Sequence, residues 1–597
     1  TNDQMLANFG TIELQMGNAK YAIELLDRSI LIKPNQPNIL NNLGNYYLEN
    51  GDVQKSIKYF DMAISLGSEN FNAFYNKGRA MTSINSMEDA INCYKQAIKI
   101  NPENKATHLN LGFIFNSTNR FDEAIHEYNV AIDLDENFTE AIFNRGITFS
   151  NQCNHEKAIE DFDVAIRIDR NARFILKRAS SYEKLESFSK ALDDYSHIIS
   201  SGSLNKDKAM AYCRRGRLQN QMNNLEKGMP DIEMAINLQP DNSDFYNEFA
   251  FGLEKLNRNE EATKRYKHAI ELDPENYIAQ MNLSRLELAS HNYRSGWQRY
   301  ESRWKAQGLG LIPLVTKKPK LESFEVKNKK ILIWGEQGLG DYIIYSTILP
   351  DALKTDNEFI VVLDSRLLDL YKASFKDFKN VVFLDSADNE DLYDYHLPFA
   401  SLGQFFRNSK QDFLNQKIPL LEADKAYTKT LRNRINSGNK HICGISWMSK
   451  NPKIGDSKSM RLEDFKSIFS LPGIDFVDLQ YGDTKKEKKE LKDNFGFELI
   501  EMTDIDNFND IGKLASLINA CDFVVTTSNV TAHLAGALNK KTYQILSYTE
   551  GRLWYWGINE NSSLWYPSIR LLRADNLKDW KTPIKNLVDS LSQEIKL

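Results

Sequence analysis

The pattern of apolar and polar residues changes once along the chain, near residue 305. Before this point, small and aromatic residues recur at intervals typical of packed helices. Beyond residue 330, apolar residues gather in short β-rich runs between helical stretches, at 331–334, 359–363, 381–384, 442–447, 476–480, 523–527 and 542–546. Alternating strand and helix signals predict parallel sheets with helices on both faces. We therefore expect a helical half followed by an α/β half.

The helical half repeats at an interval of 34 residues. Its most regular members are asparagines that each precede a glycine by two residues: Asn8, Asn42, Asn76, Asn110 and Asn144. Small residues follow each glycine at fixed distances, and aromatic residues lie between them at Tyr59, Tyr94, Tyr128 and Phe162. Small residues let two helices approach closely, and the aromatic rings fill the space beside them. The spacing predicts stacked helical hairpins in which the asparagines form a row.

An interval of 34 residues is the length of one tetratricopeptide helix–turn–helix unit. Residues 1–305 resemble the tetratricopeptide family, with about nine units and one slip of register after Ala158. The resemblance implies an α-solenoid, the tetratricopeptide superhelix. The asparagine row is interrupted at Lys177, Arg214 and Glu248, and it returns at Asn282.

Length and composition narrow the class of protein. A chain of 597 residues is too long for one core, and a net charge of −6 does not indicate a nucleic-acid partner. The five cysteines are scattered without metal-site spacing, which favours a reducing compartment. No apolar run reaches the roughly 18 residues that span a bilayer, so we predict a cytoplasmic protein without a membrane span. The first residue is Thr1 rather than methionine, as expected of a piece of a longer protein.

The α/β half begins with the motif Glu336-Gln337-Gly338-Leu339-Gly340-Asp341, between a strand and a helical stretch. Glycines here allow a sharp turn and let the backbone approach a ligand, so Gly338 and Gly340 are candidate ligand contacts. The motif lacks the third glycine of the dinucleotide fingerprint, and we expect no cofactor. Asp341 is either a helix N-cap or a catalytic group.

A second motif follows the strand at 523–527 and opens a helix. A helix N-terminus presents free N–H groups to a diphosphate, and the candidate ligand contacts there are Thr527, Ser528, Asn529, Thr531 and His533. A single histidine on a helix is more often structural. Further candidates lie at the ends of the two preceding strands: Ser446, Trp447, Lys450 and Gln480. The late aromatic residues either stack on a sugar or pack in the core: Trp554, Trp556, Trp565 and Tyr566.

Both motifs, GLGDYIIYSTILPDAL and TTSNVTAHLAGA, resemble those of the bacterial heptosyltransferase-like glycosyltransferases. The resemblance spans residues 328–580 and implies a GT-B fold of two Rossmann-like lobes, which we place at 328–430 (acceptor side) and 431–597 (nucleotide-sugar side) after a linker at 306–327. It also implies a nucleotide-sugar donor in the cleft, no essential metal, and Asp341 as the catalytic base. The family commonly has an Asp-Thr pair where this chain has Ser528-Asn529. Asp504-Ile505-Asp506 offers a metal motif of another fold, and we interpret it as a loop and cap.

The order of the two halves resembles that of the protein O-GlcNAc transferases, which join an asparagine-lined superhelix to a GT-B domain. A side-chain amide can bond both polar groups of an extended backbone, so a protein acceptor would lie on Asn42, Asn76, Asn110 and Asn144. The alternative is that these amides bond locally. The sequence predicts a glycosyltransferase that moves a sugar from a nucleotide sugar to a protein Ser or Thr hydroxyl. Two alternatives are a glycolipid or polysaccharide transferase and a non-catalytic scaffold with a degenerate transferase domain.

Overall fold

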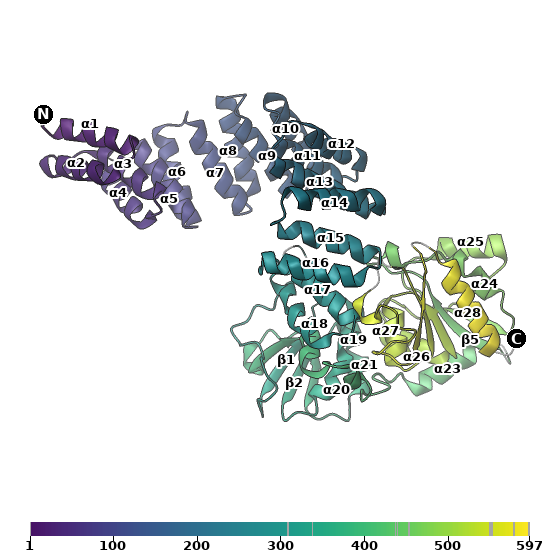
Figure 1. Cartoon of the computed structure of the whole chain (residues 1–597). Coiled ribbons are helices and arrows are strands. Elements are labelled where there is room, and N and C mark those ends of the chain that lie inside the picture. Colours follow the sequence, from purple (N-terminus) through teal and green to yellow (C-terminus); the bar gives the residue numbers. More distant parts are fainter. Residues whose placement is uncertain are drawn as a thin grey trace. The chain divides into compact units, whose positions relative to one another are not determined.

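The computed structural model describes residues 2–67, 69–306, 308, 310–336, 338–435, 438, 440–451, 454–548, 553–576 and 579–594. Gln337 of the first motif lies outside the described residues. Contacts divide the chain into two compact units, Thr1–Pro240 and Asp241–Leu597, and each is described by itself (Figure 1).

The first unit consists, in its described residues, of helices that pair in sequence order as antiparallel hairpins (Figure 1). The helices are α1 (Asn2–Gln15), α2 (Ala19–Ile32), α3 (Pro37–Glu49), α4 (Val53–Leu66), α5 (Phe71–Ser83), α6 (Met87–Ile100), α7 (Lys105–Ser117), α8 (Phe121–Leu134), α9 (Thr139–Asn151), α10 (His155–Ile168), α11 (Ala172–Lys184), α12 (Phe188–Ser200), α13 (Asn205–Gln221) and α14 (Leu225–Leu238). The predicted α-solenoid is therefore confirmed for this part of the chain.

The recurrent glycine is required by the ring that faces it within each hairpin. A Cβ atom added at Gly78 or at Gly112 would lie 2.7 Å from the ring of Tyr94 or Tyr128, respectively. Gly44 faces Phe60 in the same way at 2.4 Å, so Phe60 rather than its neighbour Tyr59 fills that position. Any side chain at these glycines would overlap the ring, which explains the 34-residue period of glycine and aromatic residue.

The second unit opens with two further helical hairpins, formed by α15 (Ser243–Lys255) with α16 (Asn259–Leu272) and α17 (Tyr277–Ala289) with α18 (Tyr293–Tyr300), and then η1 (Glu301–Trp304). In the last pair the Ser284 hydroxyl donates a hydrogen bond to the Gly296 carbonyl at 2.9 Å. These last repeats belong by their contacts to the second unit. The reason is that Tyr293, Trp297 and Tyr300 share one core with the α/β lobes.

Two parallel sheets follow, as the sequence predicts. The first has the order β3-β2-β1-β4, with β1 (Lys330–Trp334), β2 (Glu358–Val362), β3 (Val381–Leu384) and β4 (Tyr395–Pro398). The second has the order β6-β5-β7-β8-β9, with β5 (His441–Ser446), β6 (Ile474–Asp478), β7 (Phe523–Thr526), β8 (Thr542–Leu546) and β9 (Ile569–Arg573). The sequence analysis did not identify β4, a strand of only four residues, or β9, in which two arginines interrupt the apolar run.

Helices accompany both sheets (Figure 1). Those of the first lobe are α19 (Leu339–Tyr345), α20 (Leu349–Ala352), α21 (Leu368–Ser374) and α22 (Gly403–Phe406). Those of the second lobe are α23 (Lys425–Ile435), α24 (Lys466–Phe469), α25 (Lys485–Phe495), α26 (Ile511–Ala520), α27 (Val530–Ala537) and α28 (Lys581–Glu594). The helix after β1, α19, contacts the helix after β7, α27, so the carboxyl ends of these strands meet between the lobes.

Candidate functional site

The two sequence motifs meet where α19 contacts α27. A Cβ atom added at Gly340 would lie 2.9 Å from Cδ2 of His533, so only glycine permits this approach. Gly340 belongs to the first motif and His533 to the second, and 193 residues of chain separate them. The fold therefore brings the two groups of candidate residues to one place.

Asp341 lies in the first turn of α19 and is not the helix N-cap. Gly338 occupies the N-cap position, and the Asp341 backbone N–H donates to its carbonyl at 2.9 Å. The cap interpretation of Asp341 is wrong because the helix begins at Leu339, two residues before this aspartate. Asp341 as a whole residue is half-buried. Burial by the surrounding protein, assisted by the negative charge of Glu336, raises the pKa of Asp341 to about 7.

Lys458 is a buried cation in this site that the sequence analysis did not identify. It ends a short turn, η7 (Asp456–Lys458), in the segment after β5, and it is only 7% exposed. Burial lowers the pKa of Lys458, and the charge of Asp341 partly offsets that effect. Within the described ranges its ammonium group has no hydrogen-bond or ion-pair partner. Such a group is suited to an anion that enters the site.

Lys450, the lysine that the sequence analysis selected, is exposed. Its backbone N–H donates to the Tyr481 hydroxyl at 3.3 Å. Its side chain runs past Gly482, where an added Cβ would lie 3.0 Å from Cε. Lys450 is therefore an exposed charge beyond the end of β5, whereas Lys458 is buried.

The start of α27 is fixed by a network of neutral polar side chains. Asn529 is the N-cap, and its side-chain oxygen Oδ1 accepts from the Ala532 N–H and from the Thr526 hydroxyl, at 3.3 and 3.1 Å. Its amide nitrogen donates to the Ser446 hydroxyl at 2.8 Å. The Ser446 hydroxyl in turn donates to the side-chain oxygen Oε1 of Gln480 at 2.9 Å. The network joins the carboxyl ends of β5, β6 and β7 around one helix start.

The remaining candidates of the second lobe are also engaged inside the protein. The Thr527 N–H donates to the Ser446 carbonyl at 3.2 Å, and the Ser528 hydroxyl accepts from the Trp556 indole at 3.0 Å. The Thr531 hydroxyl lies 3.4 Å from that of Ser446. The indole of buried Trp447 donates to Glu487 at 2.6 Å. These side chains are therefore engaged in forming the helix start. The groups that remain for a ligand are backbone N–H groups, because the described residues contain no acceptor for the N–H groups of Val530 and Thr531.

His533 is a neutral member of an aromatic cluster. Burial, with the nearby charge of Lys458, lowers the pKa of His533 to about 3. Its two ring nitrogens lie 3.3 and 3.4 Å from the hydroxyls of Tyr566 and Tyr555, and its ring stacks on Trp556. Trp556 and Tyr566 are themselves buried, so core packing accounts for these late aromatic residues.

The asparagine row of the first unit is only partly free. The side-chain amide of Asn76 donates to the side-chain oxygen of Asn41 at 3.0 Å, and the side-chain amide of Asn110 donates to the Tyr75 hydroxyl at 3.1 Å. Both bonds join one repeat to the preceding one, as local bonding predicts. In contrast, the amides of Asn42 and Asn144 are partly exposed and have no side-chain partner in the described part of the unit. These two remain available to a guest.

No group of three or more histidine, cysteine, aspartate or glutamate side chains is arranged to hold a metal ion among the described residues. Asp504 forms a two-pronged ion pair with Arg434, and Asp506 accepts from the N–H groups of Phe508 and Asn509. Both aspartates therefore have the loop role that the sequence analysis gave them. Among the described helices, none has the length and apolar composition needed to cross a bilayer.

Comparisons with known proteins address the helical half directly. Family models described as tetratricopeptide repeat match residues 8–72 and 209–242, and one described as TPR repeat matches residues 78–117. Protein FlbA of Caulobacter vibrioides is 26% identical over 394 residues, which cover 60% of this chain and 63% of that protein. The chain thus spans less than two thirds of the length of this relative.

Two of the similar solved structures are described as tetratricopeptide repeat proteins. A tetratricopeptide repeat protein from Parabacteroides merdae is 17% identical and covers 42% of this chain and 99% of its own, with a TM-score of 0.35. YrrB, described as a TPR protein with an unusual peptide-binding site, is 21% identical and covers 29% of this chain and 90% of its own, with a TM-score of 0.27. The family models and the helical hairpins agree, and the chain contains tetratricopeptide repeats.

Proposed function

We propose that this protein is a metal-independent glycosyltransferase of the GT-B type, which moves a sugar from a nucleotide-sugar donor to a Ser or Thr hydroxyl of a protein held by the repeats. The observation that carries the proposal is the site between α19 and α27. It combines a half-buried aspartate, Asp341, with a buried lysine, Lys458, and a helix start with free N–H groups.

Asp341 is suited to act as the base. Its pKa of about 7 means that at neutral pH a large fraction is ionised while the group remains basic enough to accept a hydroxyl proton. As the proton moves to Asp341, the acceptor oxygen bonds to the anomeric carbon of the sugar. The bond from that carbon to the diphosphate oxygen breaks, and the nucleoside diphosphate leaves.

The leaving diphosphate gains negative charge, and the second lobe offers positive groups to it. Lys458 and the N–H groups of Val530 and Thr531 are those groups, and they are held before the reaction begins. Because they supply positive charge, the proposed reaction needs no metal ion. The carboxyl ends of β5 and β7 form this side of the site, which is the usual place for ligands in open parallel sheets.

The repeats would hold the acceptor protein. Asn42 and Asn144 present free amides that can bond the backbone of an extended segment without reading its side chains. One observation favours the alternative of a non-catalytic scaffold, because the hydroxyls of Ser528 and Thr531 bond inside the protein. In that case the α/β lobes would bind a sugar nucleotide weakly or not at all.

A thermal-shift screen of nucleotide sugars in chelator tests the proposal, because a donor that binds the native state raises the melting temperature. We expect at least one nucleoside diphosphate sugar to stabilise the protein and to be hydrolysed slowly without acceptor. Labelled sugar should then appear in protein rather than lipid. Turnover that stops in chelator and returns with magnesium or manganese would contradict the metal-independent reaction, and absence of any donor binding would favour the scaffold.

A further inference from the structure

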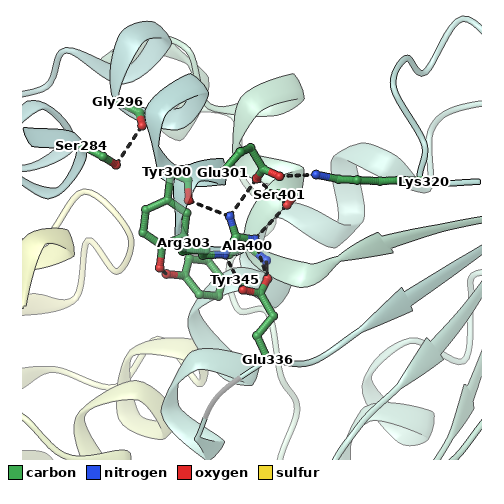
Figure 2. A network of polar contacts seen from close by, with 10 residues as sticks. All are labelled: Ser284, Gly296, Tyr300, Glu301, Arg303, Lys320, Glu336, Tyr345, Ala400 and Ser401. Carbon is green, nitrogen blue, oxygen red and sulfur yellow. Dashed lines mark hydrogen bonds and ion pairs between the residues drawn. The ribbon is translucent and has the colours of Figure 1, made fainter. Parts of the chain in front are cut away.

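The last repeat reaches the motif loop of the first lobe through a buried arginine. Arg303, in η1, is 1% exposed. Its guanidinium group donates two parallel hydrogen bonds to Glu336, from Nε at 2.6 Å and from Nη2 at 2.9 Å (Figure 2). Glu336 lies five residues before Asp341, in the loop between β1 and α19. A group of the repeats thus holds the residue Glu336, which precedes α19, the helix that carries the proposed base.

The contacts of Arg303 use all its nitrogen atoms. Nη1 donates to the Tyr300 carbonyl at 3.0 Å and to Glu301 at 2.8 Å, and Nη2 donates to the Ser401 hydroxyl at 2.9 Å (Figure 2). Glu301 also accepts from Ser401 and pairs with Lys320. A planar guanidinium that is charged at all ordinary pH values gives a fixed geometry that a lysine cannot reproduce.

Glu336 is fixed from both sides. Besides the two bonds from Arg303, its carboxylate accepts the Ala400 N–H at 3.2 Å, and its side chain is almost fully buried. An ion pair buried in this way contributes little net stability, because removing both charges from water is costly. Such a pair instead fixes the positions of its two side chains and holds their charges at a defined place.

We propose that Arg303 is a positioning residue of the transfer site, through which the last repeat fixes the Glu336 loop and the place of Asp341. This inference rests on the proposed function for the role of Asp341. It assigns to the last repeat a part in the reaction that differs from holding an acceptor.

The last repeat is suited to this task because it contacts both lobes. In the first lobe, the Trp297 indole donates to the Arg407 carbonyl at 2.8 Å, and the Tyr300 and Tyr345 hydroxyls lie 3.2 Å apart. In the second lobe, Trp297 packs edge-on against Trp554, and His291 pairs with Glu560. The last repeat therefore contacts both lobes and provides a common support for them.

Several charged or titratable groups surround Asp341 and enter its pH behaviour. On its own lobe these are Glu336 and Tyr345, and the last repeat adds Tyr300. The second lobe contributes Lys458, Tyr555, Tyr566 and the neutral His533. Glu336 is the negatively charged member that raises the pKa of Asp341, so it is the group through which Arg303 acts.

The first experiment compares Arg303→Lys with Arg407→Lys. Arg407 is a matched control, because it is equally buried and pairs with Asp351 at 2.7 Å without contacting Glu336. We expect both variants to melt at similarly reduced temperatures. Transfer by Arg303→Lys should show a kcat about 10- to 100-fold lower with a nearly unchanged donor KM, since small displacements of a reacting group reduce rates on this scale. Arg407→Lys should keep a kcat within about threefold of the wild type. Equal kcat values for the two variants would overturn the inference.

The second experiment uses Glu336→Gln, which keeps the shape of the side chain and removes its charge. The acid limb of the pH–rate profile should move to lower pH by about one unit, because Asp341 then ionises more easily. The same titration can be followed without substrate, from the difference in melting temperature between proteins with Asp341 and with Asn at that position. Its midpoint, near pH 7 in the wild type, should fall in the Glu336→Gln background.

These readouts separate the two proposals. If no nucleotide sugar is turned over but the midpoint falls, the transferase function fails and the electrostatic coupling of Glu336 with Asp341 stands. If transfer occurs and neither the midpoint nor the Arg303→Lys kcat changes, the inference fails and the transferase function stands.

Discussion

The two helix starts that form the site have the same local design but differ in charge. Each follows a parallel strand, and they touch each other through Gly340 and His533. At α27 the polar side chains are neutral and bond one another, with Asn529 at the centre. At α19 two carboxyl groups lie close together, and the charge of one raises the pKa of the other.

Under the proposed function, one half of the site would provide geometry and the other chemistry. A satisfied network of neutral groups holds one shape over a wide pH range, because none of its members titrates. Buried carboxyl groups, in contrast, change state when the pH or a ligand changes. We therefore expect substitutions at α27 to affect mainly stability, and substitutions at α19 to affect mainly rate.

The strongest test of this comparison is Asp341→Asn. We expect transfer to fall by about two to four orders of magnitude, the usual contribution of a general base. Donor affinity, measured by thermal shift, should remain, because the change is nearly isosteric. Transfer close to that of the wild type would show that α19 provides only geometry.

Lys458→Met tests whether the buried cation binds the diphosphate. Affinity for a nucleoside diphosphate, measured by titration calorimetry, should fall about 10- to 100-fold, as expected for the loss of a charged hydrogen bond. The matched change at the exposed Lys450 should alter affinity by less than about threefold. The reverse order of effects would support Lys450, the lysine that the sequence predicts.

Asn529→Ala should mainly reduce stability. It removes the cap of α27 and takes one hydrogen bond from each of the Ser446 and Thr526 hydroxyls. The free energy of unfolding should fall by roughly 2 kcal/mol, measured by denaturant titration of the intact protein. A large fall in transfer rate with unchanged stability would break the assignment of α27 to geometry.

The pH dependence of stability gives a smaller contrast. Because the folded-state pKa of Asp341 is raised, the folded protein binds this proton more tightly than the unfolded chain does. Stability from this group is therefore present at acid pH and is lost as the pH rises to about 7. Asp341→Asn should be more stable than the wild type at pH 8, by about 1–2 kcal/mol after allowance for partial solvent access. The difference should disappear near pH 4, and equal melting temperatures at both pH values would contradict it.

The asparagine row allows a comparison between side chains that bond inside the repeats and side chains that do not. The double variant Asn76→Ala with Asn110→Ala should lower the stability of the array by about 0.5–1.5 kcal/mol per lost bond. Asn42→Ala with Asn144→Ala should leave the melting curve unchanged and weaken binding of an acceptor protein by a similar free energy. If neither pair changes acceptor affinity, the acceptor docks elsewhere.

The sequence predicts what depends on local spacing. The glycine–aromatic period identified the repeats, and the apolar runs located most strands of both sheets. It did not identify Lys458, because nothing near it in the sequence distinguishes a buried lysine from an exposed one such as Lys450. Nor could it connect Arg303 with Glu336, which lie on either side of the point where the repeat pattern ends. These residues depend on contacts between distant segments, and such contacts have no local signature.

The contact between the repeated glycine and its aromatic ring also bears on how such a chain can evolve. In a hairpin such as α5–α6, glycine and ring lie in the same 34-residue segment, so duplication copies both members together. The array can therefore gain or lose whole 34-residue segments, because each segment carries both members of the contact. The last repeat is the exception, because Arg303 and Trp297 match it to the lobes, and a copy from elsewhere in the array could not replace it. Natural variation in repeat number should consequently be confined to the segments before it.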